Sequence, residues 1–334
     1  MKANLLIISF LCITIFSFGQ NIIRVQNGQN IQTLINENPA GSVFLLDPGN
    51  YAGFNTTRRI SVIGAGYFNG TNESNITSQV TFSASSSPVS SSAGSIITGC
   101  NVFDININVS NVVVSRNRVH YYAGGITIAD NTSGVIVKQC FVLNDIATSG
   151  DPTSFQIINN IVVGQIYLYN NGAALSGIIT NNVVLGENIT DCRPLIISNT
   201  TNNGVVISNN IFISASTCTN NLFPTNFLGG FHNNVFRQGT YQTANTSNTQ
   251  LTQNNLLTTL FQNQGNVDAF YRLSATSPAK LVGTGGTDCG AFGGNEPYIL
   301  SGLPTGPIIY ELKVPSTARQ NEIIPVRIKA RVQN

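Results

Sequence analysis

The chain contains the sequence Phe155-Gln-Ile-Ile-Asn-Asn-Ile-Val-Val163, and nearly the same sequence occurs twice more, as Gly177-Ile-Ile-Thr-Asn-Asn-Val-Val-Leu185 and Val205-Val-Ile-Ser-Asn-Asn-Ile-Phe-Ile213. Weaker copies lie on both sides of these three. Each copy has two short runs rich in β-branched residues, separated by a pair of polar residues. β-Branched residues favour strands, and Asn favours the bends between strands. The repeated unit is therefore a strand, a bend and a second strand.

The second amide of each copy marks the period of the repeat. Successive second amides from residue 117 to residue 234 are 21 to 28 residues apart. A period of this size, built from strands, is typical of a solenoid in which each repeat forms one coil. The sequence therefore predicts an all-β fold, a parallel β-helix, with coils from about residue 96 to about residue 260. We assign the second amides to Asn117, Gln139, Asn160, Asn182, Asn210 and Asn234.

Stacked coils would place these six amides above one another at the same bend. The residues three positions before and two positions after each amide are apolar in all copies, so we expect them to point into the coil. Asn tolerates the left-handed backbone conformation that such a bend needs. Stacked amides can also hydrogen-bond to one another as a ladder along the axis. The alternative is that the amide pairs only mark surface turns.

The strand after each bend predicts an apolar stripe on the outside of the coils. If the second residue after the amide points inward, the first and third should point outward. A soluble monomer rarely leaves a contiguous aliphatic stripe bare. The cover could be the long turn of residues 214–225, residues 307–332 or a partner molecule. We favour residues 307–332, because their two alternating strands are too small to fold alone. The stripe consists of Ile161, Val163, Val183, Leu185, Ile211 and Ile213.

Residues 1–20 have the pattern of a secretory signal peptide, with Lys2 followed by a largely apolar run from Leu5 to Phe18. No other apolar run approaches the length of a membrane span, so we expect no transmembrane segment in the mature chain. Charged residues make up 9% of the chain, against about 25% in typical soluble domains. Without Lys2 the 16 basic residues become 15, against 14 acidic ones. This neutral balance predicts no nucleic-acid partner and favours an extracellular or cell-surface role.

The mature chain keeps five of the six cysteines, an odd number. Cys192 and Cys218 follow Asn182 and Asn210 at similar distances, so they should lie in the same long turn on adjacent coils. We therefore consider them candidates for a disulfide. The other three have apolar neighbours and are predicted to be packing residues, namely Cys100, Cys140 and Cys289.

Both ends of the chain resemble a known family. Ile31-Gln-Thr-Leu-Ile35, Asp47-Pro-Gly-Asn-Tyr51 and Ile63-Gly-Ala-Gly66 resemble the opening of secreted right-handed β-helix proteins of the pectin-lyase-like superfamily. Asp288-Cys-Gly-Ala-Phe292 is similar to the closing coil of that group, and residues 294–304 resemble the tail of β-helix proteins from Bacteroidetes-type bacteria.

The residue pattern and the resemblance together predict a domain organisation. Residues 21–304 would form a parallel β-helix with an N-terminal capping helix, and the resemblance implies that it is right-handed. The alternating strands after residue 304 predict a short C-terminal β-hairpin in residues 305–334. Residues 71–95 are rich in Ser and Thr without an apolar period, so we expect an irregular coil or an inserted loop there. The resemblance also implies export to the outside of a Gram-negative-type bacterium. It implies no single activity, because the superfamily includes lyases, hydrolases and adhesins.

Lyases of this superfamily hold Ca²⁺ with carboxylates and use Lys or Arg as a base, whereas its hydrolases use clustered Asp residues. In this chain the acidic residues of the coils are dispersed, so we predict no metal site and no cofactor. Arg118, His120 and Asp145 are the residues that best suit a catalytic group: His as base, Arg to neutralise a uronate, and Asp to orient either one. The alternative is an ordinary solvated turn. Ca²⁺ would be needed only if the protein is a lyase.

Four tyrosines are candidate ligand-binding residues. Tyr167 and Tyr169 should point outward from one strand, and Tyr121 and Tyr122 lie in an entering turn. Outward tyrosine rings suit stacking on sugars, although exposed strands also carry Tyr for packing.

Three functions remain open from the sequence. The first is recognition of a polysaccharide, a cell-surface glycan or another surface partner without catalysis. The second is a polysaccharide lyase or glycoside hydrolase acting on uronate-containing polymers. The third is a structural or adhesive surface protein.

Overall fold

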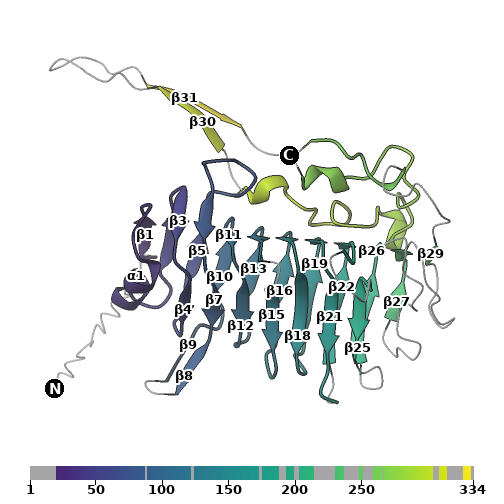
Figure 1. The fold of residues 1–334 in the computed structure, drawn as a ribbon, viewed down its shortest axis with the longest axis horizontal. Coiled ribbons are helices and arrows are strands. Elements are labelled where there is room, and N and C mark those ends of the chain that lie inside the picture. Colours follow the sequence, from purple (N-terminus) through teal and green to yellow (C-terminus); the bar gives the residue numbers. More distant parts are fainter. Residues whose placement is uncertain are drawn as a thin grey trace, which may run out of the picture.

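The computed structural model of the protein describes residues 20–86, 89–121, 124–172, 175–187, 193–198, 203–213, 230–236, 248–250, 259–265, 267–303, 308–313 and 326–331. Within these residues the chain winds into a solenoid whose coils contribute strands to three parallel sheets, called A, B and C here (Figure 1). The described strands number ten in sheet A, ten in sheet B and seven in sheet C. The all-β parallel β-helix predicted from the repeat is thus confirmed.

Each complete coil passes through sheets A, B and C in that order. Sheet A contains β1 (Ile22–Val25), β2 (Val43–Leu46), β5 (Ser61–Ile63), β10 (Ile96–Thr98), β13 (Val113–Ser115), β16 (Ile136–Lys138), β19 (Phe155–Ile158), β22 (Leu175–Thr180), β25 (Asn203–Ser208) and β27 (Gly230–His232). Sheet B contains β3 (Gly49–Tyr51), β6 (Ser74–Ile76), β11 (Asn101–Val102), β14 (Arg118–Val119), β17 (Phe141–Val142), β20 (Ile161–Val162), β23 (Val183–Val184), β26 (Ile211–Phe212), β28 (Val235–Phe236) and β29 (Thr249–Gln250). Sheet C contains β4 (Phe54–Thr56), β7 (Val80–Phe82), β12 (Ile105–Ile107), β15 (Gly125–Ala129), β18 (Asp145–Ser149), β21 (Ile166–Tyr169) and β24 (Leu195–Ile197).

The remaining elements lie outside the three sheets. Residues 71–95 contain a regular pair of coil strands, β6 and β7, and then an antiparallel hairpin, so the expected irregular coil is in fact a coil with an inserted hairpin. A second antiparallel hairpin, at the C-terminus, matches the one expected there. These elements are α1 (Ile31–Glu37), β8 (Ala84–Ser86), β9 (Val89–Ser91), β30 (Ile308–Lys313), β31 (Arg327–Arg331) and the 3₁₀ turns η1 (Ala269–Tyr271), η2 (Thr284–Gly286) and η3 (Leu300–Gly302).

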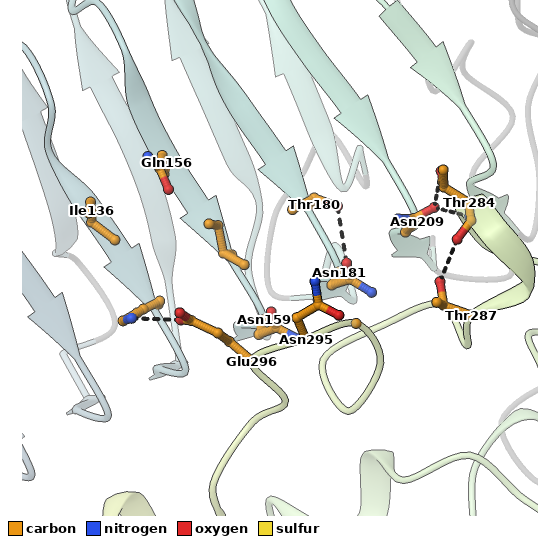
Figure 2. Close-up of a pocket in the computed structure, with 13 residues that line it drawn as sticks. Ile136, Gln156, Asn159, Thr180, Asn181, Asn209, Thr284, Thr287, Asn295 and Glu296 are labelled. Atoms are coloured by element: carbon orange, nitrogen blue, oxygen red, sulfur yellow. Dashed lines mark hydrogen bonds and ion pairs between the residues drawn. The ribbon is translucent and has the colours of Figure 1, made fainter.

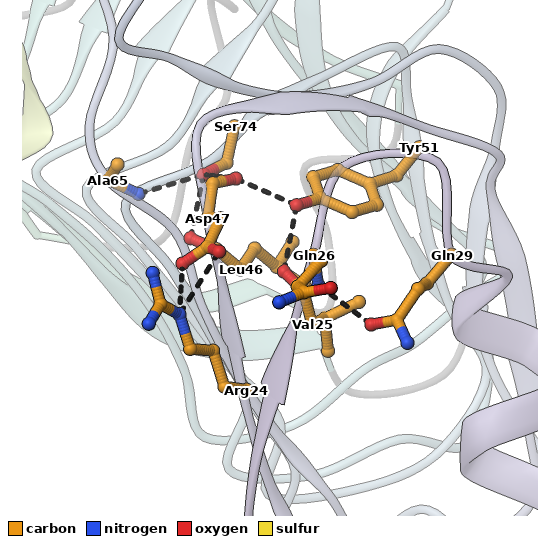
Figure 3. Close-up of polar contacts among 9 residues, drawn as sticks. All are labelled: Arg24, Val25, Gln26, Gln29, Leu46, Asp47, Tyr51, Ala65 and Ser74. Carbon is orange, nitrogen blue, oxygen red and sulfur yellow. Dashed lines mark hydrogen bonds and ion pairs between the residues drawn. The ribbon is translucent and has the colours of Figure 1, made fainter.

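The N-terminal part of the β-helix is held by polar groups that complete its first coils (Figure 3). The Tyr51 hydroxyl donates to the carbonyl oxygens of Val25 and Asp47, and the Ser74 hydroxyl donates to that of Asp47 at 3.2 Å. Arg24 Nε donates to both carboxylate oxygens of Asp47. These contacts explain the Asp47–Tyr51 motif, because its Asp and Tyr side chains tie successive coils together. Helix α1 packs Ile31 and Ile35 into the main core at this end of the solenoid.

The second amides of the bends form the predicted ladder inside the coil. Asn182 is fully buried, and its Oδ1 accepts from the backbone N–H and the side-chain Nδ2 of Asn160 at 2.9 and 3.0 Å. Asn182 in turn donates to Asn210 in the same way, and Asn210 donates to Asn234. The next member is Asn248.

One ladder assignment was wrong by one residue. Cys140 stands in the ladder position, and its backbone N–H donates to Asn160 Oδ1 at 2.9 Å. Gln139 is the first residue of that bend and has φ of 55°. The inward residues on this coil are accordingly Val137 and Val142, both fully buried.

The left-handed conformation also belongs to the first residue of the bend, not to the second as we expected. Asn159, Asn181, Asn209 and Asn233 all have φ between 53° and 57°. The two amides of each pair therefore do different things: the first makes the bend, and the second fills the ladder.

The first amides bind a segment that returns along the outside of the β-helix. This return segment, residues 259–303, runs from the last coils back toward the first ones (Figure 1). Later residues of the return segment contact bends that come earlier in the chain, so the segment runs from the C-terminal coils toward the N-terminal ones. The contacts are Asn233 Nδ2 to Val282 O, Thr284 N to Asn209 Oδ1, Asn181 Nδ2 to Asp288 O, Asn159 Nδ2 to Ala291 O, and Gln139 Nε2 to Pro297 O.

The return segment covers the predicted apolar stripe on sheet B. Ile161, Val183 and Ile211 are fully buried, and the other three members of the stripe are at most 8% exposed. They share a second hydrophobic cluster with residues of the return segment, including Leu260, Phe261, Leu273, Ala279, Cys289, Ala291 and Tyr298. The outward direction of the stripe and its cover by the chain itself are confirmed. The covering residues found in this cluster belong to the return segment, however, whereas we expected residues 307–332.

Candidate functional site

A groove lies between the return segment and the outer face of sheet A (Figure 2). Its volume is about 390 Å³, within the range of about 300–1,000 Å³ that is common for small-molecule sites. Its floor is formed by outward side chains of β16, β19 and β22, and its far wall by the return segment. The lining residues are Ile136, Lys138, Gln156, Ile158, Asn159, Thr180, Asn181, Asn209, Thr284, Thr287, Gly294, Asn295 and Glu296.

The strand period explains which side chains reach this groove. Val137 and Ile157 point into the core, so their neighbours on β16 and β19 point outward. The first bend amides then join the floor to the wall, because each binds the return segment. Gly294 has φ of 73°, and a Cβ there would lie 2.9 Å from Asn181 Oδ1. Glycine is therefore needed at Gly294 for the wall to approach the bend this closely.

The charges of the groove cancel each other. Lys138 Nζ lies 2.6 Å from Glu296 Oε2, which joins the floor to the wall at one end. Gln139 Nε2 supports the same corner by donating to the Glu296 carbonyl oxygen at 3.1 Å. Glu296 is also the one carboxylate in the lining, whereas glycoside hydrolysis generally uses two. The lining therefore does not contain the pair of carboxylates that most glycoside hydrolases use.

Two amides in the groove have no hydrogen-bond partner among the residues that the structure describes. The side-chain amides of Gln156 and Asn295 make no hydrogen bond within the described part of the chain. Gln156 lies on the floor beside Ile136 and Ile158, and Asn295 lies on the wall next to Glu296 (Figure 2). Both amides can donate and accept, so a hydroxylated ligand would find one amide on the floor, one on the wall, and aliphatic side chains beside the amide on the floor.

Arg118 and His120 lie on the outer face of sheet B, outside the groove. The Arg118 guanidinium lies 4.9 Å from the centre of the Phe68 ring. Burial, and secondly the Arg118 charge, lowers the pKa of His120. Arg118 Nε and His120 Nδ1 are buried without a hydrogen-bond partner in the described structure.

Asp145 is not joined to these two residues. Its Oδ1 accepts from the Gln165 backbone N–H at 3.0 Å and its Oδ2 from Gln165 Nε2 at 3.3 Å. Burial raises the pKa of Asp145. The described residues show no hydrogen bond or ion pair between Asp145 and either Arg118 or His120, so the predicted trio is not assembled.

The three described tyrosines among the four chosen from the sequence lie in two different places. Tyr167 and Tyr169 are on β21 of sheet C with ring centres 6.4 Å apart, and Tyr169 is 44% exposed. Tyr121 follows β14 and stacks on Phe103 with ring centres 3.9 Å apart. Tyr122 lies outside the described residues, as do Cys192 and Cys218. A role for the tyrosines in ligand binding stays a prediction.

Our reading of the sequence missed the groove. Its floor residues follow from the strand period, but its wall comes from a segment without that period. One feature of the sequence pointed to the wall of the groove. Most bends carry two amides, although the ladder needs only one, so the other amide was free to bind a further segment.

The described residues contain no group of three or more His, Cys, Asp or Glu side chains that could hold a metal ion. They also contain no helix that is long and apolar enough to cross a membrane. Comparison of the chain with models of protein families finds no match, and comparison with curated proteins finds none either.

Proposed function

We propose that this protein is an exported β-helix protein that binds extracellular carbohydrate in the groove beside the return segment without cleaving it. The observation that carries the proposal is the pair of unpartnered amides, Gln156 and Asn295, facing a groove with an aliphatic floor. Sugars present hydroxyl groups at their edges and C–H groups on their faces, and this groove offers a partner for each.

Export and the type of β-helix belong to the same proposal. Support for export comes from the apolar N-terminal run that follows Lys2. Support for a right-handed β-helix of the pectin-lyase-like kind comes from the parallel three-sheet architecture together with the motifs at both ends of the chain. The corresponding location is the medium or the outer surface of a Gram-negative-type bacterium.

Retention on polysaccharides tests the proposal. The mature protein, residues 21–334, is passed over a panel of insoluble polysaccharides, and the supernatant is assayed for released sugar. We expect retention on at least one polysaccharide without release of product. Gln156→Ala combined with Asn295→Ala should abolish retention. Asn106→Ala should not, because Asn106 is an outward amide on sheet C, away from the groove.

Two other results would change the conclusion. Loss of retention in Tyr167→Ala and Tyr169→Ala, but not in the groove variant, would move the site to sheet C. Absence of retention on every polysaccharide would reject carbohydrate binding and favour a structural or adhesive role.

A second candidate function, a polysaccharide lyase, is favoured by the state of His120. A neutral imidazole is a competent base, and burial beside Arg118 lowers the pKa of His120 and so keeps it neutral. A lyase would produce unsaturated uronides, which absorb ultraviolet light, and their formation would depend on Ca²⁺ if carboxylates hold that ion. We expect no such absorbance from uronate polymers, and its appearance together with its loss in His120→Ala would establish the lyase instead.

A further inference from the structure

The groove runs along the axis of the β-helix and not along its strands. Its floor and bends come from four successive coils, those of β16, β19, β22 and β25. Adjacent coils are about 4.8 Å apart, so three steps span about 14 Å. The return segment contacts these coils one after another and forms a wall parallel to the axis. A ligand in the groove must therefore be elongated and lie across the strands.

The lining also repeats along that direction. Three of the four coils contribute a first bend amide, Asn159, Asn181 or Asn209, and three contribute outward side chains from sheet A. A polymer with a short repeating unit would therefore contact similar side chains on each coil. A compact ligand would contact only one coil. The wall closes one side, which excludes branches directed toward the return segment.

The one cation in the groove is already neutralised. Glu296 holds Lys138 at 2.6 Å, and 28% of the Lys138 side chain remains exposed. An acidic sugar would have to displace Glu296 to reach Lys138, and its carboxylate would then lie beside the displaced one. A neutral sugar needs no such exchange and can use the free amides of Gln156 and Asn295.

We infer that the groove selects a linear, uncharged oligosaccharide that lies parallel to the β-helix axis, and this inference rests on the proposed carbohydrate binding. The Lys138–Glu296 pair is then a specificity device that makes the groove unattractive to uronates. Gln156 and Asn295 hold hydroxyl groups of the ligand from the floor and from the wall.

Calorimetric titration of the mature protein with oligosaccharides of increasing length tests the inference. One series is neutral and linear, built from the sugar of the retained polysaccharide, and the other carries a uronate in each unit. Affinity for the neutral series should rise with length until the ligand spans the groove and then level off. The uronate series should bind weakly or not at all.

A charge variant provides the sharper test. Glu296→Gln should free Lys138 and raise uronate affinity about 10- to 100-fold, as a new charge-assisted hydrogen bond would. The double variant Lys138→Met with Glu296→Gln should lose that gain, because no cation then remains in the lining of the groove. Gln156→Ala with Asn295→Ala should weaken the neutral series.

The outcomes separate this inference from the function on which it rests. Tight uronate binding by the unaltered protein, or affinity independent of length, would overturn the inference and leave carbohydrate binding in place. An unchanged uronate affinity in Glu296→Gln would also overturn it. Absence of binding in both series would overturn the inference together with the proposed function.

Discussion

At the scale of single residues, the two amides of each bend have different structural roles although they are of the same type. Asn182 points into the ladder, where it is fully buried and bonded to the coils on both sides. Asn181 adopts the left-handed conformation and reaches out to the return segment. The tight bend leaves buried backbone groups without a backbone partner, and the ladder amides form the hydrogen bonds that water cannot provide there.

Asn182→Leu should destabilise the protein by about 2–4 kcal/mol, because the backbone N–H of Asn160 and the carbonyl oxygen of Ile157 both lose a buried partner. Chemical denaturation at equilibrium measures the effect. Asn106→Leu, on the outer face of sheet C, is the control and should change stability by less than about 0.5 kcal/mol. Equal denaturation midpoints for the two variants would contradict a stabilising ladder.

Cys140 leaves a gap in the ladder that can be filled. Its thiol donates weakly to the Val114 carbonyl oxygen at 3.7 Å, and burial raises the pKa of this thiol to about 12. Cys140→Asn should stabilise the protein by about 1 kcal/mol, because an amide donates more strongly and offers Asn117 an acceptor. The melting temperatures of Cys140→Asn and Cys140→Ser measure the effect. Cys140→Ser is the control, because the serine side chain is too short to bridge the coils. A lower melting temperature for Cys140→Asn would show that the larger side chain does not fit there.

At the scale of elements, the return segment is held by side chains of the bends and not by a sheet. Asn159 Nδ2 donates to the carbonyl oxygens of Ala291 and Gly293 at 2.9 and 2.7 Å. Contacts of this kind recur along the segment, so each can be removed singly. They position Asn295 and Glu296 over the groove, which makes the first amides part of the site although they also belong to the fold.

Asn159→Gly should loosen the return segment locally while the bend persists, because glycine keeps the left-handed backbone but lacks the amide. Hydrogen exchange of residues 289–296 should accelerate, and exchange of the strands should not. Asn131→Gly is the matched control, since Asn131 has φ of 58° and is exposed. Unchanged exchange in residues 289–296 would mean that apolar packing alone holds the segment.

At the scale of the whole molecule, the return segment buries the outer face of sheet B from β17 to β28. Burying each Val, Leu or Ile side chain stabilises a protein by about 1.5–3 kcal/mol, so the stripe contributes strongly to stability. On the hairpin of β30 and β31, the described side chain of Ile328 is 57% exposed. In Figure 1 this hairpin projects away from the solenoid.

A chain ending at Leu303 should therefore keep the melting temperature of the full protein. A chain ending at residue 258 should aggregate or melt at a lower temperature, because it exposes an apolar stripe of several hundred Å². Thermal unfolding with light scattering distinguishes the two. A large loss of stability in the chain ending at Leu303 would show that the C-terminal hairpin also covers the β-helix.

The sequence by itself determined the strands, the bends and the order of the coils. These features depend on residues that are close in the chain. In Phe155–Val163, for example, the alternation of side chains indicates which of them face the core. The same local reasoning predicted the outward stripe on sheet B. It misplaced Gln139 because a bend with one amide does not show whether that amide makes the turn or fills the ladder.

Only the tertiary structure decided what covers sheet B and where the groove lies. Asn181 meets Asp288 across 107 residues of sequence, and Lys138 meets Glu296 across 158. The return segment has no strand period, and its position follows from side-chain contacts with bends that are distant in the chain. Such contacts depend on the three-dimensional stacking of the coils, so their partners cannot be read from the pattern of either segment alone.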